Sequence, residues 1–250
     1  MTRETTLTAR IVETPEITSI QRSRMFSILE KYFEGYQWDN FHHDLNEKNG
    51  VLLLETDTIQ GFTTFQFLKG TVAGKAIRAV FSGDTILEKE YWGETVLGTE
   101  WSKYMLKQAA TGPASLYWFL LCSGYKTYRF LPAYFNEFYP RYNEPTPQYE
   151  QEVLDYFATV KFRDMYTPET GIVRFKHSDE RLKPGVADIT DAKRNNPHIQ
   201  FFIEKNPRHA EGEELCCITE ISPANYRQSA LRRFNHDTNK NSVWETPQRV

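Results

Sequence analysis

The sequence has no long hydrophobic run and no block of like charges. No apolar stretch approaches the roughly 18 to 20 residues that span a bilayer, and the polar residues 1–10 lack the apolar core of a signal peptide. Lys and Arg together number 30 against 33 Asp and Glu, so the formal net charge is -3. No general positive field therefore draws a polyanion. We expect a cytoplasmic protein with no membrane span and no nucleic-acid partner.

Cysteine is scarce, and the histidines are not spaced as metal ligands. The three cysteines include the neighbours Cys216 and Cys217, a pattern more typical of reduced, buried thiols than of a disulfide framework or a zinc site. His42 and His43 are adjacent, so on a helix they point about 100° apart, and no HExxH spacing accompanies them. We expect no metal. A cysteine-dependent hydrolase pairing Cys122 with one of these histidines is an alternative, although the apolar neighbours of Cys122 favour packing.

A chain of 250 residues with 40% hydrophobic residues can bury a core without disulfides. Residues 143–147 contain two prolines among polar residues and indicate a linker. We expect a core at residues 1–142, a C-terminal part at 143–235 that completes the sheet and the acceptor side, and a polar tail at 236–250.

Hydrophobic periodicity predicts an α/β (α+β) fold. In the first part of the chain it indicates a strand at 7–12, an amphipathic helix at 18–36 capped by Thr18 or Ser19, a helical turn at 38–49 and an antiparallel three-stranded meander at 51–81. A glycine-punctuated loop and a helix at 98–110 follow.

The second part of the chain alternates between predicted helices and strands. The apolar segment 116–121 is interpreted as a buried helix, 125–131 as an aromatic strand, and Pro132 as the start of a helix that buries Phe135 and Phe138. Farther on, we expect helices at 149–160 and 222–234 and strands at 172–175, 199–203 and 215–221.

The loop between the meander and the next helix is the predicted anion site. The first N–H groups of a helix have no intrahelical partner and carry about half a positive charge, so a loop that opens a helix after a strand can bind phosphate. Arg129, together with Lys126 and Arg141, is a candidate for contacting phosphate or an acidic carrier protein. The loop residues in question are Trp92, Gly93, Glu94, Thr95, Val96, Leu97 and Gly98.

This order of elements resembles the GNAT superfamily of N-acyltransferases over roughly residues 7–142. Members carry a helix after the first strand, a three-stranded meander, a pyrophosphate loop that opens a helix, a further strand and a helix bearing a tyrosine. Gly61 and Phe62 resemble part of the family's meander, and Phe138 and Tyr139 resemble its Phe/Leu-Tyr pair. The resemblance implies a mixed, mostly antiparallel central sheet flanked by helices, here with a C-terminal extension.

The same resemblance implies an activity. The expected reaction moves an acyl group from acyl-CoA or acyl-phosphopantetheine to an amine of an amino acid, polyamine or peptide side chain. Gly93 and Gly98 are five apart and no Arg or Gln leads them, which departs from the usual loop. A longer loop beside Trp92 resembles divergent members that transfer fatty acyl groups, often from an acyl carrier protein. The alternative is a non-catalytic GNAT-like module that binds an acyl or nucleotide ligand.

Acyl transfer to an amine requires a base and gains from an acid. A lysine-like amine has a pKa near 10.4, so neutralising it at pH 7 costs about 4.6 kcal/mol. Asp84 and Glu88 follow the meander where the family places its base or its proton-relaying waters; alternatively, they are solvated loop acids. Tyr139 is the predicted proton donor to the departing thiolate; alternatively, its ring only packs at a helix edge.

Overall fold

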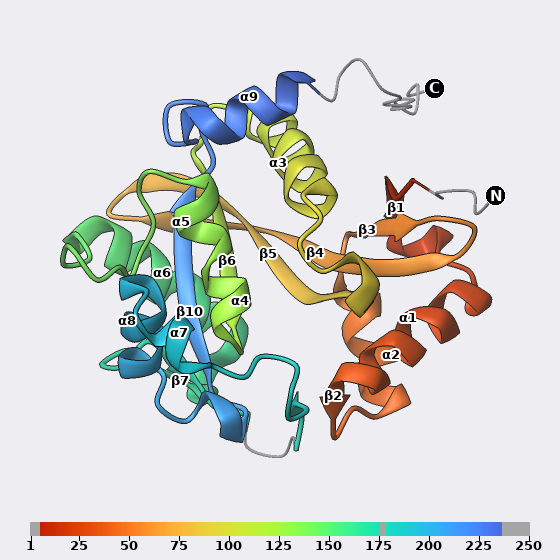
Figure 1. Ribbon diagram of the computed structural model, residues 1–250. Coiled ribbons are helices and arrows are strands. Elements are labelled where there is room, and N and C mark those ends of the chain that lie inside the picture. Colours follow the sequence, from red (N-terminus) through yellow and green to blue (C-terminus); the bar gives the residue numbers. More distant parts are fainter. Residues whose placement is uncertain (1–5, 176–178, 237–250) are drawn as a thin grey trace.

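A computed structural model describes residues 6–175 and 179–236, and its centre is an eight-stranded sheet (Figure 1). Neighbouring strands are antiparallel except for β5 and β6, which are parallel. The predicted mixed, mostly antiparallel fold class is therefore confirmed. In spatial order the strands are β1 (Thr8–Glu13), β3 (Gly50–Glu55), β4 (Ile59–Val72), β5 (Lys75–Leu87), β6 (Leu116–Cys122), β10 (Glu214–Glu220), β8 (Ile172–Val173) and β7 (Tyr166–Thr167).

Helices cover both faces of the sheet. One face carries α1 (Ser19–Tyr32), α2 (Trp38–Glu47) and α6 (Gln148–Phe162), and the other carries α3 (Val96–Ala109), α4 (Tyr125–Tyr128), α5 (Phe130–Tyr134), α8 (Pro197–Lys205) and α9 (Gln228–His236). A short helix α7 (Asp191–Arg194) precedes α8, and a two-stranded sheet pairs β2 (Phe33–Glu34) with β9 (Arg181–Leu182).

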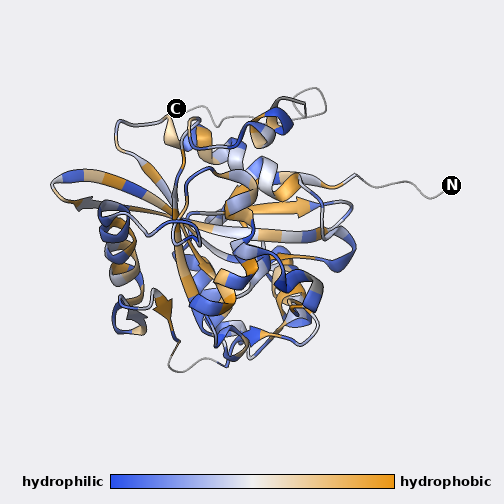
Figure 2. Ribbon diagram, turned by 60° about the vertical axis from the view of Figure 1, so that its left-hand side comes forward, coloured by the Kyte–Doolittle hydropathy of each residue, from blue (hydrophilic) through white to orange (hydrophobic). Residues whose placement is uncertain are grey.

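Side-chain alternation along the strands divides the core between the two faces. In β3, Leu52 and Leu54 pack toward α3, whereas Val51 and Leu53 pack toward α1 and α2. Burial of this kind on both faces produces a continuous apolar run in the sequence. Figure 2 shows the resulting concentration of apolar residues on the central strands.

The predicted start of the fold is confirmed in detail. Helix α1 begins at Ser19 after Thr18, whose side chain accepts a hydrogen bond from the Gln21 amide while the Gln21 side chain accepts one from the Thr18 amide. This capping box supplies two helix-terminal donors with partners. Helices α3 and α6 also lie where the periodicity placed them, within a few residues. The meander does too, except that its last strand β5 continues past the predicted end at residue 81 to Leu87. The observed order from β1 to α4 is the order that the resemblance to the GNAT superfamily implies.

Three predicted elements are wrong. Residues 116–121 form strand β6 and not a helix, because the strand is buried on both faces and an all-apolar run has no strand periodicity. Residues 125–131 form α4 and the start of α5 and not a strand. Residues 199–203 lie in α8, which Asn196 caps and Pro197 opens.

Two further boundaries differ from the prediction. The helix expected from Pro132 ends at Tyr134, so Phe135 and Phe138 are buried outside any helix. The last helix begins at Gln228 and not at Ser222.

The predicted C-terminal part, residues 143–235, supplies β7, β8 and β10 to the same sheet as the first part, because β10 pairs with β6. The two parts therefore share one sheet. Residues 237–250 of the predicted tail lie outside the described residues.

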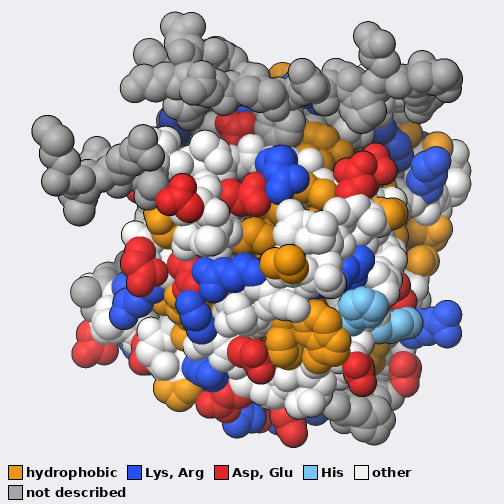
Figure 3. All heavy atoms as spheres, turned by 90° about the vertical axis from the view of Figure 1, so that its right-hand side faces the viewer, with side chains coloured by type: hydrophobic (Ala, Val, Ile, Leu, Met, Phe, Trp, Pro, Cys, Tyr) orange, Lys and Arg blue, Asp and Glu red, His pale blue; other side chains and the backbone are white. Residues whose placement is uncertain are grey.

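The face that carries α1 and α2 mixes acidic and basic side chains (Figure 3). Trp38 on α2 is 39% exposed, and its ring stacks against His42. His43 is exposed, and its Nε2 lies 3.5 Å from Glu47 Oε1.

Cys122, in contrast, is fully buried on the α3 face of the sheet, where its thiol contacts Cys217. The structure does not bring Cys122 to these histidines, so the hydrolase alternative has no site.

Candidate active site

A cleft opens in the sheet where β5 leaves β6. The two strands pair from Arg78 opposite Leu116 to Ser82 opposite Leu120, after which β5 continues beside β4 to Leu87. A cleft of about 930 Å³ occupies this opening. Among the described residues, pairing between the two strands ends at this point, so the edge of β5 beyond Ser82 faces the cleft.

A β-bulge lies at the mouth of the opening. Gly83 and Asp84 of β5 together face the single residue Thr64 of β4. Such a bulge bends the strand and re-aims the side chains next to it. A Cβ on Gly83 would lie 2.5 Å from the Thr64 hydroxyl and 2.9 Å from Lys48 Cε, so only glycine fits here. The bulge thus allows Asp84 to face the cleft.

The predicted anion loop lines one end of this cleft. Its members Trp92, Gly93, Glu94, Thr95 and Leu97 all contribute to the wall. Helix α3 begins at Val96, and its first intrahelical bond runs from the Thr99 amide to the Thr95 carbonyl at 2.9 Å. The amides of Val96, Leu97 and Gly98 therefore precede any intrahelical acceptor. A phosphate group can accept hydrogen bonds from amides of this kind.

Two other residues of the loop contribute to packing. Val96 packs against the core on the α3 face. Gly98 is buried, and a Cβ there would lie 2.2 Å from the Tyr134 hydroxyl. The absence of a side chain at Gly98 therefore lets the Tyr134 hydroxyl reach the first turn of α3.

Positively charged side chains surround the same end of the cleft. Lys126, Arg129, Lys193 and Arg233 all line it. Lys126 Nζ lies 3.4 Å from the centre of the Trp92 ring. Burial, and then the charges of Lys193 and Lys89, lower the pKa of Lys126. Positive charges close to a helix N-terminus are suited to binding a polyanion.

Arg141, the third predicted cation, lies elsewhere. It donates to the Asn136 carbonyl at 2.9 Å and forms an ion pair with Glu144. It is not among the residues that line the cleft.

Asp84 also lines the cleft. The Tyr36 hydroxyl donates a hydrogen bond of 2.6 Å to Asp84 Oδ1. Burial, assisted by the negative charge of Asp44, raises the pKa of Asp84 to about 7, against the effects of the Tyr36 hydrogen bond and of Lys48. A carboxylate with such a pKa can accept a proton near neutral pH.

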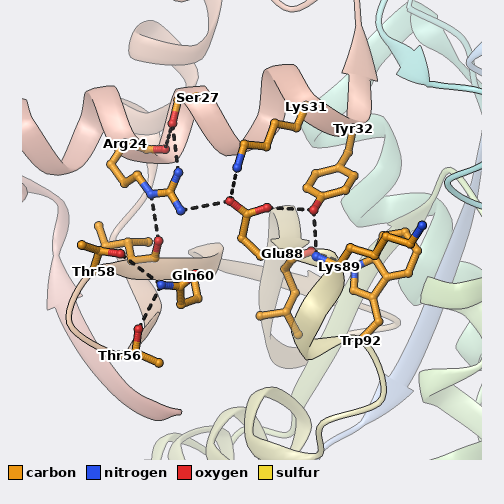
Figure 4. A network of polar contacts seen from close by, with 12 residues as sticks. Arg24, Ser27, Lys31, Tyr32, Thr56, Thr58, Gln60, Glu88, Lys89 and Trp92 are labelled. Carbon is orange, nitrogen blue, oxygen red and sulfur yellow. Dashed lines mark hydrogen bonds and ion pairs between the residues drawn. The ribbon is translucent and has the colours of Figure 1, made fainter. Parts of the chain in front are cut away.

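Glu88, directly after β5, occupies a different environment. It accepts hydrogen bonds from Arg24 at 3.0 Å, from Tyr32 at 2.8 Å and from Lys31 (Figure 4). Burial opposes ionisation, but the hydrogen bonds from Lys31, Tyr32 and Arg24 outweigh it and lower the pKa of Glu88. Glu88 does not line the cleft. Its geometry suits fastening the end of β5 to α1 better than accepting a proton.

Tyr139 is not brought to the cleft. Its backbone forms a bridge to Ile218 of β10, with both N–H···O distances at 2.8 Å. The side chain packs in the core beneath α6, and the Arg141 guanidinium lies 5.2 Å from its ring centre. Tyr134 lines the cleft instead, and burial raises its pKa. The sequence interpretation chose Tyr139 because Phe138 and Tyr139 resemble the family's Phe/Leu-Tyr pair, but the helix expected from Pro132 ends at Tyr134.

Other residues of the cleft had no signal in the sequence. Glu214 of β10 lines the same end as Asp84, and burial raises its pKa to about 7 even though Ser123 donates a hydrogen bond to it. Lys161 of α6 also lines the cleft, and burial together with Lys48 lowers its pKa to about 8. Both residues come from the C-terminal half, so only tertiary pairing places them here.

Among the described residues, no group of three or more His, Cys, Asp or Glu side chains is arranged to hold a metal ion. Over those same residues, no helix is both long and apolar enough to cross a bilayer.

Comparisons with known proteins find likeness in solved structures. No protein-family profile matches the chain, and no curated protein does. A probable N-acyltransferase from Enterococcus faecalis V583 is similar with a TM-score of 0.40 and 16% identity over 52% of this chain, which spans 33% of that protein. YhbS, a GNAT family N-acetyltransferase from Escherichia coli in complex with CoA, is similar with a TM-score of 0.36 and 20% sequence identity. The match covers 50% of this chain and 68% of YhbS. NAA60 from Arabidopsis thaliana in complex with a bisubstrate analogue is similar with a TM-score of 0.38 and 11% sequence identity. The match covers 55% of this chain and 92% of NAA60.

Proposed function

We propose that the protein is an N-acyltransferase that moves an acyl group from a CoA thioester to an amine inside the cleft between β5 and β6. The observation that carries the proposal is the arrangement of this one volume. It joins the opening turn of α3 and four cationic side chains to a carboxylate, Asp84, whose pKa lies near neutrality.

The donor binds at the cationic end. Its pyrophosphate lies at the opening turn of α3, where Thr95 and Leu97 line the cleft, and Lys126 and Arg129 balance its charge. The pantetheine arm extends along the edge of β5 beyond Ser82, where backbone groups face the cleft. An acyl carrier protein presents the same arm on an acidic surface, so it is the competing donor.

The acceptor amine enters at the end that holds Asp84. Its nitrogen lone pair attacks the carbonyl carbon and forms the C–N bond, while the C–S bond breaks and its electron pair remains on sulfur. The proton of the amine passes to Asp84. Raising the pKa of Asp84 from 3.8 to about 7 makes this transfer less unfavourable by about 4 kcal/mol.

Tyr134 is the proposed proton donor to the departing sulfur, in place of Tyr139. Burial raises its pKa, so the hydroxyl stays protonated at neutral pH. The hydroxyl lies at the first turn of α3, and Tyr134 lines the same cleft as Asp84. A phenol in that position can supply the proton that completes the free thiol.

The three cysteines are all free and buried, which accords with the predicted cytoplasmic location. That location stays a prediction, as does the choice among an amino acid, a polyamine and a peptide side chain as acceptor.

Free thiol release tests the proposal. Acetyl-CoA and an acetylated acyl carrier protein are each mixed with the protein and a panel of amines, and thiol is followed with a colorimetric reagent. Amine-dependent release from acetyl-CoA is expected, with a loss of about 10² to 10⁴-fold in Asp84→Asn. Asp57→Asn is the control, because Asp57 is exposed in the turn between β3 and β4. Binding of CoA without any amine-dependent release would instead indicate a non-catalytic module.

A further inference from the structure

A lysine that the proposed reaction does not use lies in the same cleft. Lys161, in the last turn of α6, lines the cleft together with Lys48 and Phe81. Its Nζ lies 4.5 Å from the centre of the Phe81 ring and 5.7 Å from that of Phe162, and it donates a hydrogen bond of 2.9 Å to Gln66 Oε1. Two rings and one amide oxygen therefore hold the amino group of Lys161 at the wall of the cleft.

Lys161 and Asp84 reach the cleft from the same face of the sheet. Phe81, which contacts Lys161, packs beneath α6. Tyr36, whose hydroxyl donates to Asp84, packs against the core beneath α1 and α2, and these helices cover the same face as α6. The positive charge of Lys48 acts on the pKa of both Lys161 and Asp84, so both groups lie near one lysine. The proposed proton acceptor and the amine of Lys161 therefore share one side of the cleft.

The amine of Lys161 loses its proton more readily than an exposed lysine does. Burial and the positive charge of Lys48 lower its pKa to about 8, although Asp44 and Glu47 of α2 act in the opposite direction. The hydrogen-bond partner Gln66 is a neutral amide, which does not hold the charged form as a carboxylate would. At pH 7 about one chain in ten then carries the neutral amine, against about one in 2,500 for a lysine of ordinary pKa.

We propose that Lys161 is an acylation site of the protein itself, to which a thioester bound in the cleft transfers its acyl group when no external amine is present. The proposal rests on the acyltransferase function above and adds an acceptor within the chain. The lone pair of Lys161 Nζ attacks the carbonyl carbon and forms the C–N bond, while the C–S bond breaks and its electron pair remains on sulfur. The proton that the nitrogen loses passes to Asp84, as with an external amine. The products are an N-acyl lysine and free CoA.

The surroundings of Lys161 suit the product as well as the amine. The amide N–H of an acylated Lys161 can still donate to Gln66 Oε1. Acylation removes the positive charge and with it the burial cost that lowers the pKa of Lys161. The cleft of about 930 Å³ leaves room for the added group. The alternative is a structural lysine whose ammonium group only ties α6 to β4 through Gln66.

Intact-mass analysis of the full-length protein, incubated with acetyl-CoA and no amine, tests the proposal. One acetyl group per chain is expected. Peptide mapping should show Lys161 labelled at least about tenfold faster than Lys69 of β4 and Lys75 of β5, because these two lysines are exposed and not brought to the cleft. An unlabelled Lys161, or equal labelling of all three lysines, would overturn the proposal.

A second thioester shows whether the label depends on the donor site. S-acetyl-N-acetylcysteamine carries the same acetyl thioester without the pyrophosphate. At equal concentration, acetyl-CoA should label Lys161 at least about tenfold faster, because its phosphates bind at the cationic side chains around α3. Equal rates from the two thioesters would show only a reactive lysine and would contradict the proposal.

A matched pair of variants confirms the position and the intramolecular route. Lys161→Arg keeps the charge but offers no nucleophilic amine, so the single acetyl group should be lost, whereas Lys69→Arg should keep it. Donor site and acceptor belong to one chain, so the first-order rate constant should not change over a tenfold range of protein concentration. A rate constant that rises in proportion to protein concentration would refute transfer within the chain.

Thiol release with the amine panel in Lys161→Arg tests the proposed function separately, because this variant cannot acylate itself at that position. Amine-dependent release in the variant, together with an unlabelled Lys161 in the wild type, would refute the acylation site and leave the proposed function standing. Labelling of Lys161 from acetyl-CoA without amine-dependent release would support the acylation site and refute transfer to an external amine.

Discussion

The substitution Asp84→Asn should stabilise the protein while it abolishes activity. Burial in the folded state raises the pKa of Asp84 from 3.8 to about 7, so the folded protein binds a proton there more tightly than the unfolded chain does. Stability therefore falls as the pH rises from about 4 to about 7, and above that range the ionised carboxylate costs up to about 4 kcal/mol. Asn keeps the acceptor oxygen for Tyr36 and carries no charge.

Urea unfolding between pH 4 and pH 8.5 measures this effect. The free energy of unfolding of Asp84→Asn minus that of the wild type should be close to zero near pH 4 and should rise to between about 2 and 4 kcal/mol at pH 8. The charge of Asp84 also helps raise the pKa of Glu214, so the difference includes the relief of this repulsion, which acts in the same direction. Asp57→Asn should show no such rise.

The reasoning is refuted if Asp84→Asn is no more stable than the wild type at pH 8. A pH-independent gain would also contradict it, because the gain must follow the titration of the carboxylate. A stabilising substitution that removes activity is the expected behaviour of a residue kept for chemistry at a cost in stability.

Three further predictions follow from the same geometry. Glu88→Gln should lower the free energy of unfolding by about 1 to 2 kcal/mol at pH 7, because Arg24 and Lys31 lose their counter-charge. Since the pKa of Glu88 is lowered, this loss of stability should shrink as the pH falls below about 4.5. Urea unfolding at pH 7 and below pH 4.5 measures the difference. Tyr134→Phe should reduce kcat by about 10² to 10⁴-fold in the thiol-release assay, whereas Tyr139→Phe, whose ring lies under α6, should change kcat less than threefold; the reverse result would restore Tyr139 as the acid. Lys126→Met should raise KM for acetyl-CoA by about tenfold, as expected for one charge-assisted hydrogen bond, and Lys69→Met, an exposed change on β4, should leave KM unaltered.

Local signals in the sequence were sufficient for the elements that carry one amphipathic face. Helix α1 has a capping box, and it, the meander and helix α3 have a period that predicted them. Strand β6 was not, because burial on both faces removes the alternation that identifies a strand. The segment after β6 is rich in aromatic residues, which favoured a strand where α4 forms.

The candidate acid Tyr139 was chosen because Phe138 and Tyr139 resemble the family's Phe/Leu-Tyr pair. The structure ends α5 at Tyr134 and places Tyr139 outside any helix, in a bridge to Ile218 of β10. Asp84 was expected just after the meander but lies within β5, and it lines the same cleft as Trp92 to Thr95 and Leu97 of the predicted loop. Glu214 could not be found, because it joins the cleft only through the pairing of β10 with β6, about a hundred residues apart.

A crystal structure with acetyl-CoA bound tests the central claim most directly. The account predicts that the pyrophosphate of acetyl-CoA lies at the opening turn of α3 and that its pantetheine arm runs along the edge of β5 beyond Ser82 towards Asp84. Acetyl-CoA bound outside the opening between β5 and β6, or an empty cleft at saturating acetyl-CoA, would contradict it.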